Sequence, residues 1–340
     1  MNKLREVAYS FCVHSGLARV ISYFHRDRLA ILCFHSISLK DENQFWPGVF
    51  ISQPKLIELL DYLKTSHYSV ISLQEAERFL KGEVTYDNPL VITIDDGWFS
   101  SVSELIPVIS SYNFPCTLYV TTYYCDHQIP VVNVLLQYWL WQKPTQNISI
   151  EFEGETHCFS GEPQDVVKAV EQAMEGMGDQ RKVAFLRCFA RKIGVSDEAI
   201  DSRRFHNATY EELEQVLISP LVDVQLHTHT HKLPFDEASM DREVATNKRL
   251  LKRRLSPVNS LEHLCYPSGI WSPKHIPHLE EMGMATATTL DEGLNATSQH
   301  PLKLKRNLVM DSRSLPHFIV TISGILEVMR RSLRKLKRAN

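Results

Sequence analysis

The stretch Val91-Ile92-Thr93-Ile94-Asp95-Asp96-Gly97 is the most informative part of the chain. Four β-branched residues in a row are typical of a buried strand. Side chains alternate along a strand, so Asp95 and Asp96 should leave its carboxyl end in different directions. Two carboxylates at the end of an apolar strand are costly unless a cation, a proton or a donor offsets their charge. Asp-Gly is also a common turn dipeptide, so the stretch alone does not decide between a site and a turn.

A cluster of histidines follows a second predicted strand. His227-Thr228-His229-Thr230-His231 comes directly after the apolar segment 221–226. A single histidine is more often a polar residue with its hydrogen bonds made inside the protein. Three histidines within five residues are not explained by core packing. Imidazoles at positions i and i+4 converge where the backbone turns helically. Two imidazoles and one carboxylate, with a position left for water, make the ligand set of a catalytic zinc centre. A solvated or adventitious metal-binding histidine tract is the alternative.

The two motifs together resemble those of the NodB-homology polysaccharide deacetylases, metal-dependent hydrolases that remove N-acetyl and sometimes O-acetyl groups from sugars. Residues 93–97 match the family's Thr-Phe-Asp-Asp-Gly motif, and residues 227–231 match its His-Ser/Thr-x-x-His motif, in the expected order. The resemblance implies that Asp95 is the catalytic base. It also implies a divalent metal, zinc first and cobalt, nickel or manganese as alternatives, held by Asp96, His227 and His231. His229 falls on a variable position of the motif and is left out of the ligand set.

Weaker similarities point to one branch of this family, which includes poly-N-acetylglucosamine deacetylases and many proteins of surface-polysaccharide pathways. Residues 29–37 resemble the branch's Leu-x-Tyr-His-x-Val opening, and residues 265–269 are similar to its Tyr-Pro-x-Gly motif. The segment 302–306, followed by Phe318 and Ser323-Gly324, is similar to its closing pattern.

The chain departs from the family pattern at two positions. Many members carry an Arg that orients the base, and none precedes Tyr266-Pro267 here, so Arg306 is the candidate substitute. The late Leu-x-x-His motif that supplies the general acid has no clear match either. In this branch the elements look circularly permuted, and the early histidine fills that position. His35 is therefore the candidate acid, and a polar residue at a strand end without a catalytic role is the alternative.

The resemblance also implies a mechanism. The metal would supply Lewis-acid polarisation of the water and of the acetyl carbonyl. Asp95 would take the proton of the attacking water, and the backbone N–H of Tyr266 would help to stabilise the oxyanion. His35, protonated, would deliver a proton to the departing amine. Pro267 and Gly97 complete the positions expected at the substrate.

The motifs leave two other functions open. They do not separate N-deacetylation from hydrolysis of an O-acetyl ester or of another amide on the same barrel. A catalytically silent carbohydrate-binding relative is the third class. The presence of all four motif residues speaks against it, and the missing late motifs speak for it.

Composition agrees with an enzyme of ordinary globular type. The chain has 340 residues with 44% hydrophobic and 23% charged residues, both near globular averages. A formal net charge of −3 gives no indication of nucleic-acid binding. Seven cysteines at irregular spacings, without a Cys-x-x-Cys pair, argue against a disulfide framework or a zinc knuckle and fit reduced thiols in the cytosol. No uninterrupted apolar stretch is long enough to cross a bilayer.

The first 28 residues do not read as a signal peptide. Basic residues and histidines are scattered among the apolar ones, and no clean apolar centre or small-residue cleavage site is present. The apolar spacing predicts an amphipathic helix. We prefer packing of this helix against the barrel to contact with a membrane. The expected compartment is the cytoplasm, which favours a lipid-linked or nucleotide-linked acetyl-sugar precursor over finished cell-wall polymer.

Strands alternate with helices along most of the chain, which indicates a mostly parallel sheet with helices outside it. The family resemblance narrows this to an α/β fold, a distorted (β/α) barrel of seven or eight strands spanning residues 29–325. The motif residues would then lie at the carboxyl ends of strands, where such barrels assemble their active sites. Expected strands are 29–34, 90–94, 116–121, 222–226, 263–266 and 284–289, and expected helices are 53–65, 73–81, 100–112, 236–254 and 273–282.

A largely helical insertion is expected at about residues 126–210, between the two motifs. It begins with the apolar and aromatic segment 131–141, and Thr209 is a reasonable helix N-cap at its end. An insertion near the mouth of a barrel is placed to shape substrate choice. Tyr138, Trp139 and Trp141 are candidates for stacking on sugar rings, but packing against the barrel is the interpretation we favour.

The segment 326–340 is predicted to be a basic amphipathic helix. It is suited to peripheral contact with anionic lipid, which would fit a lipid-linked substrate. A solvated terminal helix is an equal alternative.

Overall fold

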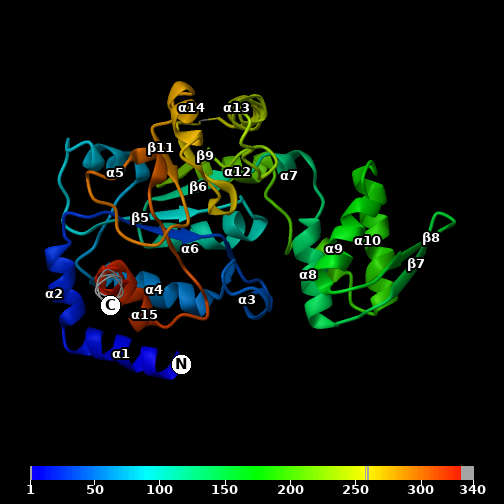
Figure 1. Cartoon of the computed structure of the whole chain (residues 1–340), viewed down its shortest axis with the longest axis horizontal. Coiled ribbons are helices and arrows are strands. Elements are labelled where there is room, and N and C mark those ends of the chain that lie inside the picture. The colour runs from blue at the N-terminus through cyan, green and yellow to red at the C-terminus, as the bar shows by residue number, and fades with distance from the viewer. Residues whose placement is uncertain (1, 257, 259, 331–340) are drawn as a thin grey trace, which may run out of the picture.

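A curled, all-parallel sheet forms the centre of the protein (Figure 1). The computed structural model describes residues 2–256, 258 and 260–330. The strand order is β11-β10-β9-β6-β5-β1-β12, and β4 pairs with β5 beside this path. These strands are β1 (Ala30–Phe34), β4 (Ser69–Val70), β5 (Pro89–Ile94), β6 (Cys116–Val120), β9 (Val222–Leu226), β10 (His263–Cys265), β11 (Thr286–Thr288) and β12 (Asn307–Leu308).

The segment from Leu304 to Leu308 joins the two ends of this strand order. Leu304 makes a parallel bridge to Thr288 at the end of β11, and its N–H donates to the carbonyl of Ala287 (2.8 Å). Three residues later, β12 pairs with β1. The sheet therefore closes into a distorted barrel, which confirms the predicted fold class.

The alternation of side chains separates the interior of the barrel from its outer face. Residues at alternate positions, such as Ile31, Val91 and Leu304, share one small buried cluster. Their neighbours along the strands belong to the large cluster that also contains the covering helices. Because successive side chains of a strand point to opposite faces, Asp95 continues the interior series of β5. Asp96 then leaves the strand at its end.

Helices cover the outside of the barrel. They are α4 (Gln53–Thr65), α5 (Leu73–Leu80), α6 (Ile106–Ser111), α12 (Tyr210–Leu217), α13 (Glu237–Arg254), α14 (His275–Glu281) and α15 (Leu315–Ile322). The shorter elements are β2 (Ser36–Ile37), α3 (Glu42–Phe45), β3 (Phe50–Ile51), α7 (Tyr123–Asp126) and the 3₁₀ turns η2 (Pro267–Gly269) and η3 (Pro301–Lys303). All five helices expected around the barrel are present, and the predicted helix 53–65 has its observed bounds.

The predicted helix 100–112 differs in its first turns. Residues Ser101–Leu105 form the π-helix η1, and regular α-helix follows in α6. Pro107 lacks the N–H that would complete an α-helical hydrogen bond to residue 103, so the wider turn precedes it. The predicted N-cap at Thr209 is confirmed, because its side chain accepts from Glu212 and completes a capping box.

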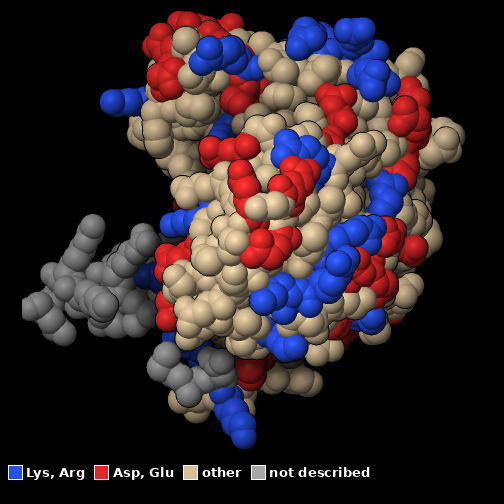
Figure 2. All heavy atoms as spheres, turned by 90° about the vertical axis from the view of Figure 1, so that its right-hand side faces the viewer, with Lys and Arg blue, Asp and Glu red and all other residues tan. Residues whose placement is uncertain are grey.

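The segment between the two motifs forms a separate lobe beside the barrel (Figure 1). Its core packs Trp139 of α8 with Phe185 and Phe189 of α10. The hairpin partner β8 was not predicted, and its turn at Glu153-Gly154 has positive φ at both residues (53° and 86°). Figure 2 shows the face that carries this lobe, where acidic and basic side chains are interspersed. The elements of the lobe are α8 (Val132–Gln142), β7 (Ile148–Phe152), β8 (Glu155–Phe159), α9 (Pro163–Ala173), α10 (Asp179–Ile193) and α11 (Glu198–Asp201).

A buried ion-pair network attaches this lobe to the barrel. Arg204, which is 4% exposed, pairs with Glu42 and with Asp41 (2.7 Å) on the β2–β3 connection. The same guanidinium donates to the hydroxyl of Tyr138 on α8 (2.8 Å). Because a buried charge is tolerated only when it is paired, this network fixes the middle of α8 against the β2–β3 connection at the barrel mouth.

The N-terminal segment is two helices, so the expectation of a single one is wrong. Gly16 has φ 79° and separates α1 (Asn2–His14) from α2 (Leu17–Phe24). A glycine adopts this left-handed conformation without the steric cost of a Cβ, and the helix ends there. One face of α1 packs on the barrel's helices through Tyr9 and Val13, as preferred above. Its opposite face is exposed.

Residues 325–330 are helical, and the rest of the predicted basic helix, 331–340, lies outside the described residues. Among the residues that the structure describes, no helix has the length and apolarity needed to span a bilayer.

Candidate active site

The polar residues singled out in the sequence gather at one end of the barrel. Parallel pairing of β1 with β5 sets Phe34 opposite Ile94, so the next residues, His35 and Asp95, lie side by side. Strand β9 delivers His227 to the same end. This is the carboxyl end of the strands, where the sequence placed the site.

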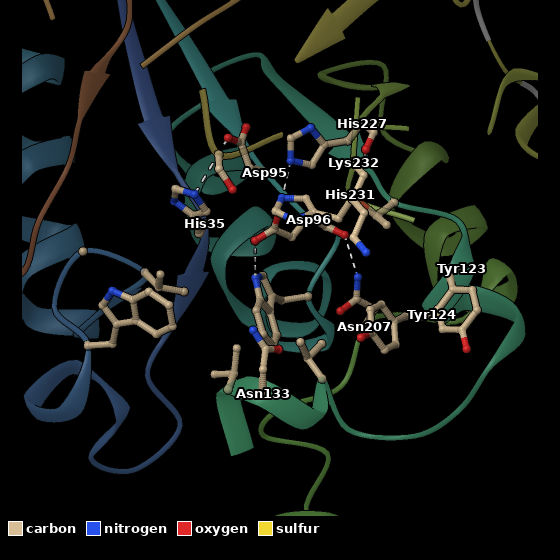
Figure 3. Close-up of a pocket in the computed structure, with 18 of the residues that line it drawn as sticks. His35, Asp95, Asp96, Tyr123, Tyr124, Asn133, Asn207, His227, His231 and Lys232 are labelled. Atoms are coloured by element: carbon tan, nitrogen blue, oxygen red, sulfur yellow. Dashed lines mark hydrogen bonds and ion pairs between the residues drawn. The ribbon is translucent and has the colours of Figure 1, made fainter. Parts of the chain in front are cut away.

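Asp96, His227 and His231 form a compact triad of potential metal ligands (Figure 3). The Nε2 atom of His227 lies 3.2 Å from Oδ1 of Asp96, and Nε2 of His231 lies 3.3 Å from the same oxygen. Burial alone would raise the pKa of Asp96, but hydrogen bonds from the two imidazoles outweigh it and hold that pKa well below its usual range.

The donor set fits a tetrahedral divalent ion. Ligand atoms about 2.0–2.1 Å from a tetrahedral zinc ion are separated from each other by roughly 3.3 Å, close to the two distances from the histidine nitrogens to Oδ1 of Asp96. The Nδ1 atom of His227 is 2.9 Å from the carbonyl oxygen of Cys265, so Nδ1 would keep its proton when a metal binds, and Nε2 would lose the proton that it shares with Asp96 and become the ligand atom. The described residues therefore provide two nitrogens and one carboxylate for a divalent metal.

Backbone turns and neighbouring side chains hold the acidic ligand in place. Asp96 has φ 72°, a conformation that Asp adopts more readily than most residues. The indole N–H of Trp98 donates to Oδ2 of Asp96 (2.9 Å), and the amide of Asn207 donates to its carbonyl (2.7 Å). The oxygen facing the histidines thus stays free for a metal.

A second anchored turn carries His231. Thr228 and His231 both have positive φ (63° and 58°), which bends the chain so that two imidazoles four residues apart meet. Glu243 on α13 accepts hydrogen bonds from the backbone N–H and the hydroxyl of Thr230 (2.8 and 2.7 Å). His229 turns away, with Nδ1 3.0 Å from the hydroxyl of Thr122, in agreement with its exclusion from the ligand set.

Asp95 forms a buried ion pair with Arg306. The two guanidinium nitrogens Nη1 and Nη2 donate to Oδ1 and Oδ2 at 2.6 and 2.8 Å, and Arg306 is fully buried. Further donation to Thr93 and Thr289 fixes the guanidinium plane. Burial alone would raise the pKa of Asp95, but the guanidinium outweighs it and keeps the carboxyl ionised. Arg306 therefore contacts Asp95, the residue that it was predicted to orient.

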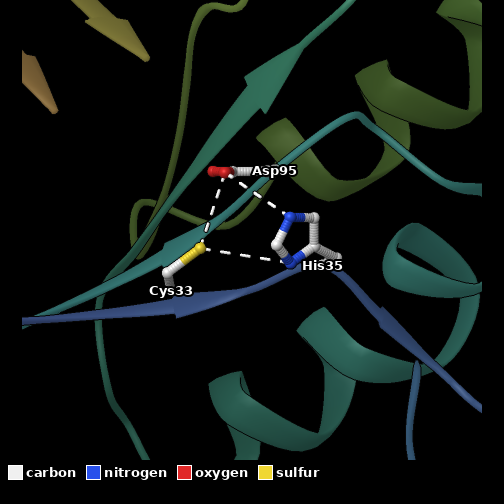
Figure 4. Close-up of side chains that lie close together, drawn as sticks. All are labelled: Cys33, His35 and Asp95. Atoms are coloured by element: carbon white, nitrogen blue, oxygen red, sulfur yellow. Dashed lines mark hydrogen bonds and ion pairs between the residues drawn. The ribbon is translucent and has the colours of Figure 1, made fainter. Parts of the chain in front are cut away.

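His35 and two thiols lie beside Asp95, and Figure 4 shows His35 and the thiol of Cys33. Nε2 of His35 lies 3.8 Å from Oδ2 of Asp95. The thiols of Cys33 and Cys265 donate to the same oxygen at 3.5 and 3.4 Å. Burial lowers the pKa of His35 despite the nearby carboxylates, so the imidazole is neutral near pH 7. Burial raises the pKa of both thiols, which are thus weak neutral donors rather than thiolates.

Three predicted substrate positions do not face the cavity. The backbone N–H of Tyr266 donates to the carbonyl of Thr288 (3.1 Å) and continues the β10–β11 ladder, so the expectation that it stabilises an oxyanion is wrong. Its phenol is buried and donates to the carbonyl of Leu302 (2.8 Å). Pro267 is buried, and the N–H of Gly97 is used by the Asp95 carbonyl (3.0 Å). Ser268 lines the cavity in their place.

A cavity of about 820 Å³ opens beside the triad, between the barrel mouth and the lobe. Apolar side chains such as Trp46, Val134 and Met310 form much of its wall, and Asn133, Asn207 and Lys232 add polar groups (Figure 3). The aromatic residues proposed for stacking are not part of it. Tyr138 and Trp139 are buried, but Trp139 packs on Phe189 within the lobe, whereas packing against the barrel was expected. Trp141 is 43% exposed and does not line the cavity.

Sequence reasoning missed the residues that support the site. Trp98 and Asn207 hold Asp96, and Cys33 and Cys265 touch Asp95. The only signal was proximity, because Trp98 and Cys33 flank recognised motif residues. Asn207 gives no such signal, since it reaches the site from a distant part of the chain.

Comparison with solved structures identifies the fold. The chain is similar to a Streptococcus pyogenes deacetylase, PplD, with a TM-score of 0.58, 14% identity and coverage of 87% of this chain and 98% of that one. It is also similar to IcaB from Ammonifex degensii, with a TM-score of 0.56, 19% identity and coverage of 87% and 97%. A de-N-acetylase from Aggregatibacter actinomycetemcomitans gives 0.56, 16% identity and coverage of 86% and 98%. No protein-family model matches the chain, and no curated protein matches it. The chain thus has the fold of the NodB-homology polysaccharide deacetylases.

Proposed function

We propose that the protein is a metal-dependent hydrolase that removes an acetyl group, most simply an N-acetyl group, from a sugar of a glycan or glycan precursor. The observation that carries this proposal is the joint geometry of Asp95, Asp96, His227 and His231. The Nε2 atoms of His227 and His231 lie 3.2 and 3.3 Å from Oδ1 of Asp96, and Asp95 is an ionised carboxylate outside this triad. The fold that the chain shares with several deacetylases supports the same proposal.

The site residues have different proposed roles in the reaction. Asp96, His227 and His231 hold the divalent ion, proposed as zinc, which supplies Lewis-acid polarisation when bound. Asp95 lies within 4.8 Å of a ring nitrogen of His227, so one of its oxygens is placed to receive the proton of a water at the triad. Arg306 orients that carboxylate and keeps it ionised before the proton arrives.

His35 is proposed as the group that passes the proton to the leaving amine. Because burial lowers its pKa, it starts neutral near pH 7 rather than protonated as the sequence suggested. Its Nε2 faces Asp95 at 3.8 Å, so it is placed to accept the proton from that carboxylate before donating it. A group that accepts and then donates within one cycle suits a histidine.

The expected substrate is a short acetylated saccharide or the end of a glycan. The cavity combines apolar walls with a few amide and ammonium groups, a mixture suited to sugar rings with hydroxyls at their edges. The lobe contributes Val131, Asn133 and Val134 to this wall, which supports a role for the insertion in substrate choice. All seven cysteines are free thiols, in keeping with a proposed cytoplasmic location.

The test separates metal binding from chemistry. Asp95→Asn should abolish acetate release and retain the metal, whereas His227→Ala should lose both, as measured by elemental analysis and an acetate assay. His229→Ala is the matched control from the same tract and should retain metal and activity. Full activity of Asp95→Asn would refute the assignment of the base.

Paired substrates decide the reaction class. Acetate release from N-acetyl and O-acetyl forms of one saccharide distinguishes an amidase from an esterase. A protein that binds metal and sugar but releases acetate from neither form would be a silent binding relative, and the proposal of an enzyme would fail.

A further inference from the structure

Apolar side chains gather on the exposed face of α1 and α2, outside the barrel. Of the sixteen exposed large apolar residues among the described part of the chain, seven lie on these two helices. Scattered single apolar residues are normal on a protein surface, but a contiguous group marks an interaction site. We call this group the α1–α2 face. Its members are Leu4, Val7, Phe11, Leu17, Val20, Tyr23 and Phe24.

The spacing shows that the exposed group is one side of each helix. Leu4, Val7 and Phe11 stand at i, i+3 and i+7 and are 80%, 66% and 68% exposed. The opposite side of α1 packs on the core, with Tyr9 and Val13 partly buried. In α2, Leu17, Val20 and Phe24 repeat the same spacing while Ala18 and Ser22 are buried. Each helix therefore has two apolar sides, and the protein itself covers only one.

Cations border this face. Lys3, Arg5, Arg19 and Arg26 are exposed on and around the two helices, where Asp27 is an exposed acid and Arg26 lies 3.9 Å from Asp87. Glu6, the only acid within either helix, accepts a hydrogen bond from Ser314. The local excess of positive charge contrasts with the formal net charge of −3 of the whole chain. Apolar side chains between exposed cations are the pattern of a helix that lies in a membrane interface.

The end of the described chain lies beside the same helices. The Nδ1 atom of His25 is 3.1 Å from the carbonyl oxygen of Ser323, and Arg28 pairs with Glu327 at 3.7 Å. The ten residues of sequence that follow residue 330 contain five Lys or Arg and no acid.

We propose that the α1–α2 face docks the protein on the surface of an anionic phospholipid bilayer. Phospholipid supplies both the apolar layer that the seven side chains lack and the phosphates that match the bordering cations. The two helices lie on the barrel at a distance from the lobe (Figure 1), and none of their residues lines the catalytic cavity. Docking there leaves the cavity open, and the inference is independent of the reaction proposed above.

The full-length protein is tested by co-sedimentation with phosphatidylglycerol and with phosphatidylcholine vesicles. We expect binding to phosphatidylglycerol vesicles that weakens at high salt, and at least tenfold weaker partitioning to phosphatidylcholine. The triple variant Leu4→Ser, Val7→Ser, Phe11→Ser should reduce partitioning at least tenfold. The matched control is Ile218→Ser, Phe235→Ser, Ile270→Ser, three residues of similar exposure (77%, 62% and 59%) on other elements, which should bind as the parent does.

Four results would overturn the proposal. The first is that the parent protein fails to sediment with phosphatidylglycerol vesicles. The second is that the α1 triple variant partitions to these vesicles as well as the control variant does. The third is a lipid-free dimer, seen by light scattering, that the α1 substitutions abolish, because the face would then pack on a second copy. Truncation after residue 330 separates the contributions: loss of all binding on truncation, with normal binding by the α1 variant, assigns the contact to the basic tail and also refutes the proposal. Melting temperatures of the variants check that each one folds.

Discussion

Removal of the Arg306 side-chain charge should expose how strongly the barrel interior depends on the Asp95–Arg306 pair. In Arg306→Met, Asp95 keeps its burial (2% exposed) but loses both guanidinium hydrogen bonds, at 2.6 and 2.8 Å. The two weak thiol donors and the imidazoles of His35 and His227 remain near it, and none replaces the guanidinium charge pair. Breaking a buried ion pair on one side costs about 3–5 kcal/mol, because the remaining charge stays buried and uncompensated. We expect a loss of that size at pH 7 in urea denaturation.

The pH dependence identifies the cause. In the parent protein the pKa of Asp95 is depressed, so the pair stabilises the fold above the unfolded value of about 3.9 and loses this contribution as pH falls through the folded value. In Arg306→Met, burial acts without the guanidinium and raises the folded pKa above the unfolded one. The folded variant then binds a proton first, so its deficit relative to the parent should shrink as pH falls from 7 towards 4.

The control is the double variant Arg306→Met, Asp95→Asn, which removes both charges and should recover most of the lost stability. A loss below about 1 kcal/mol at pH 7, which is typical of an exposed pair, would contradict the reasoning. A deficit that does not change between pH 7 and pH 4.5 would contradict it as well.

Three further substitutions test other parts of the structure. Trp98→Phe removes the donor to Oδ2 of Asp96 and should weaken metal affinity by about 10–100-fold in a competition titration with little loss of stability, whereas unchanged affinity would exclude a positioning role. Burial lowers the pKa of His206 to about 4, so the free energy of unfolding should fall by about 3 kcal/mol as pH drops from about 6.5 to 4. In pH-dependent denaturation, His206→Leu should lose less stability than the parent over that range. Identical pH profiles of variant and parent would show that His206 is not the cause. Gly269→Ala should destabilise the protein by more than about 1 kcal/mol, since φ is 67° and the new Cβ would stand 2.6 Å from Cβ of Leu290; a neutral melting temperature would count against this account.

The local sequence determined the secondary structure and most of the site. Short, mostly apolar runs bounded by loop residues favour buried strands, and the six strands expected between residues 29 and 289 were found close to their predicted bounds. Two acids after one such strand and two histidines after another had to meet at a common edge, because the carboxyl ends of parallel strands lie together. The fold class followed from the same pattern once the resemblance had narrowed it.

Tertiary structure decided the features that depend on pairing across the barrel. The backbone N–H of Tyr266 is not free, because it donates to the carbonyl of Thr288 on the neighbouring strand β11. The local sequence does not show which strand lies beside it. The same closure of the barrel brings Cys33 and Cys265 onto Asp95 and buries His35 enough to keep it neutral. An apolar spacing in α1 predicts an amphipathic helix, but it does not say which side the protein covers. Hydrogen-bond partners and burial are properties of residues far apart in sequence, which is why local patterns could not supply them.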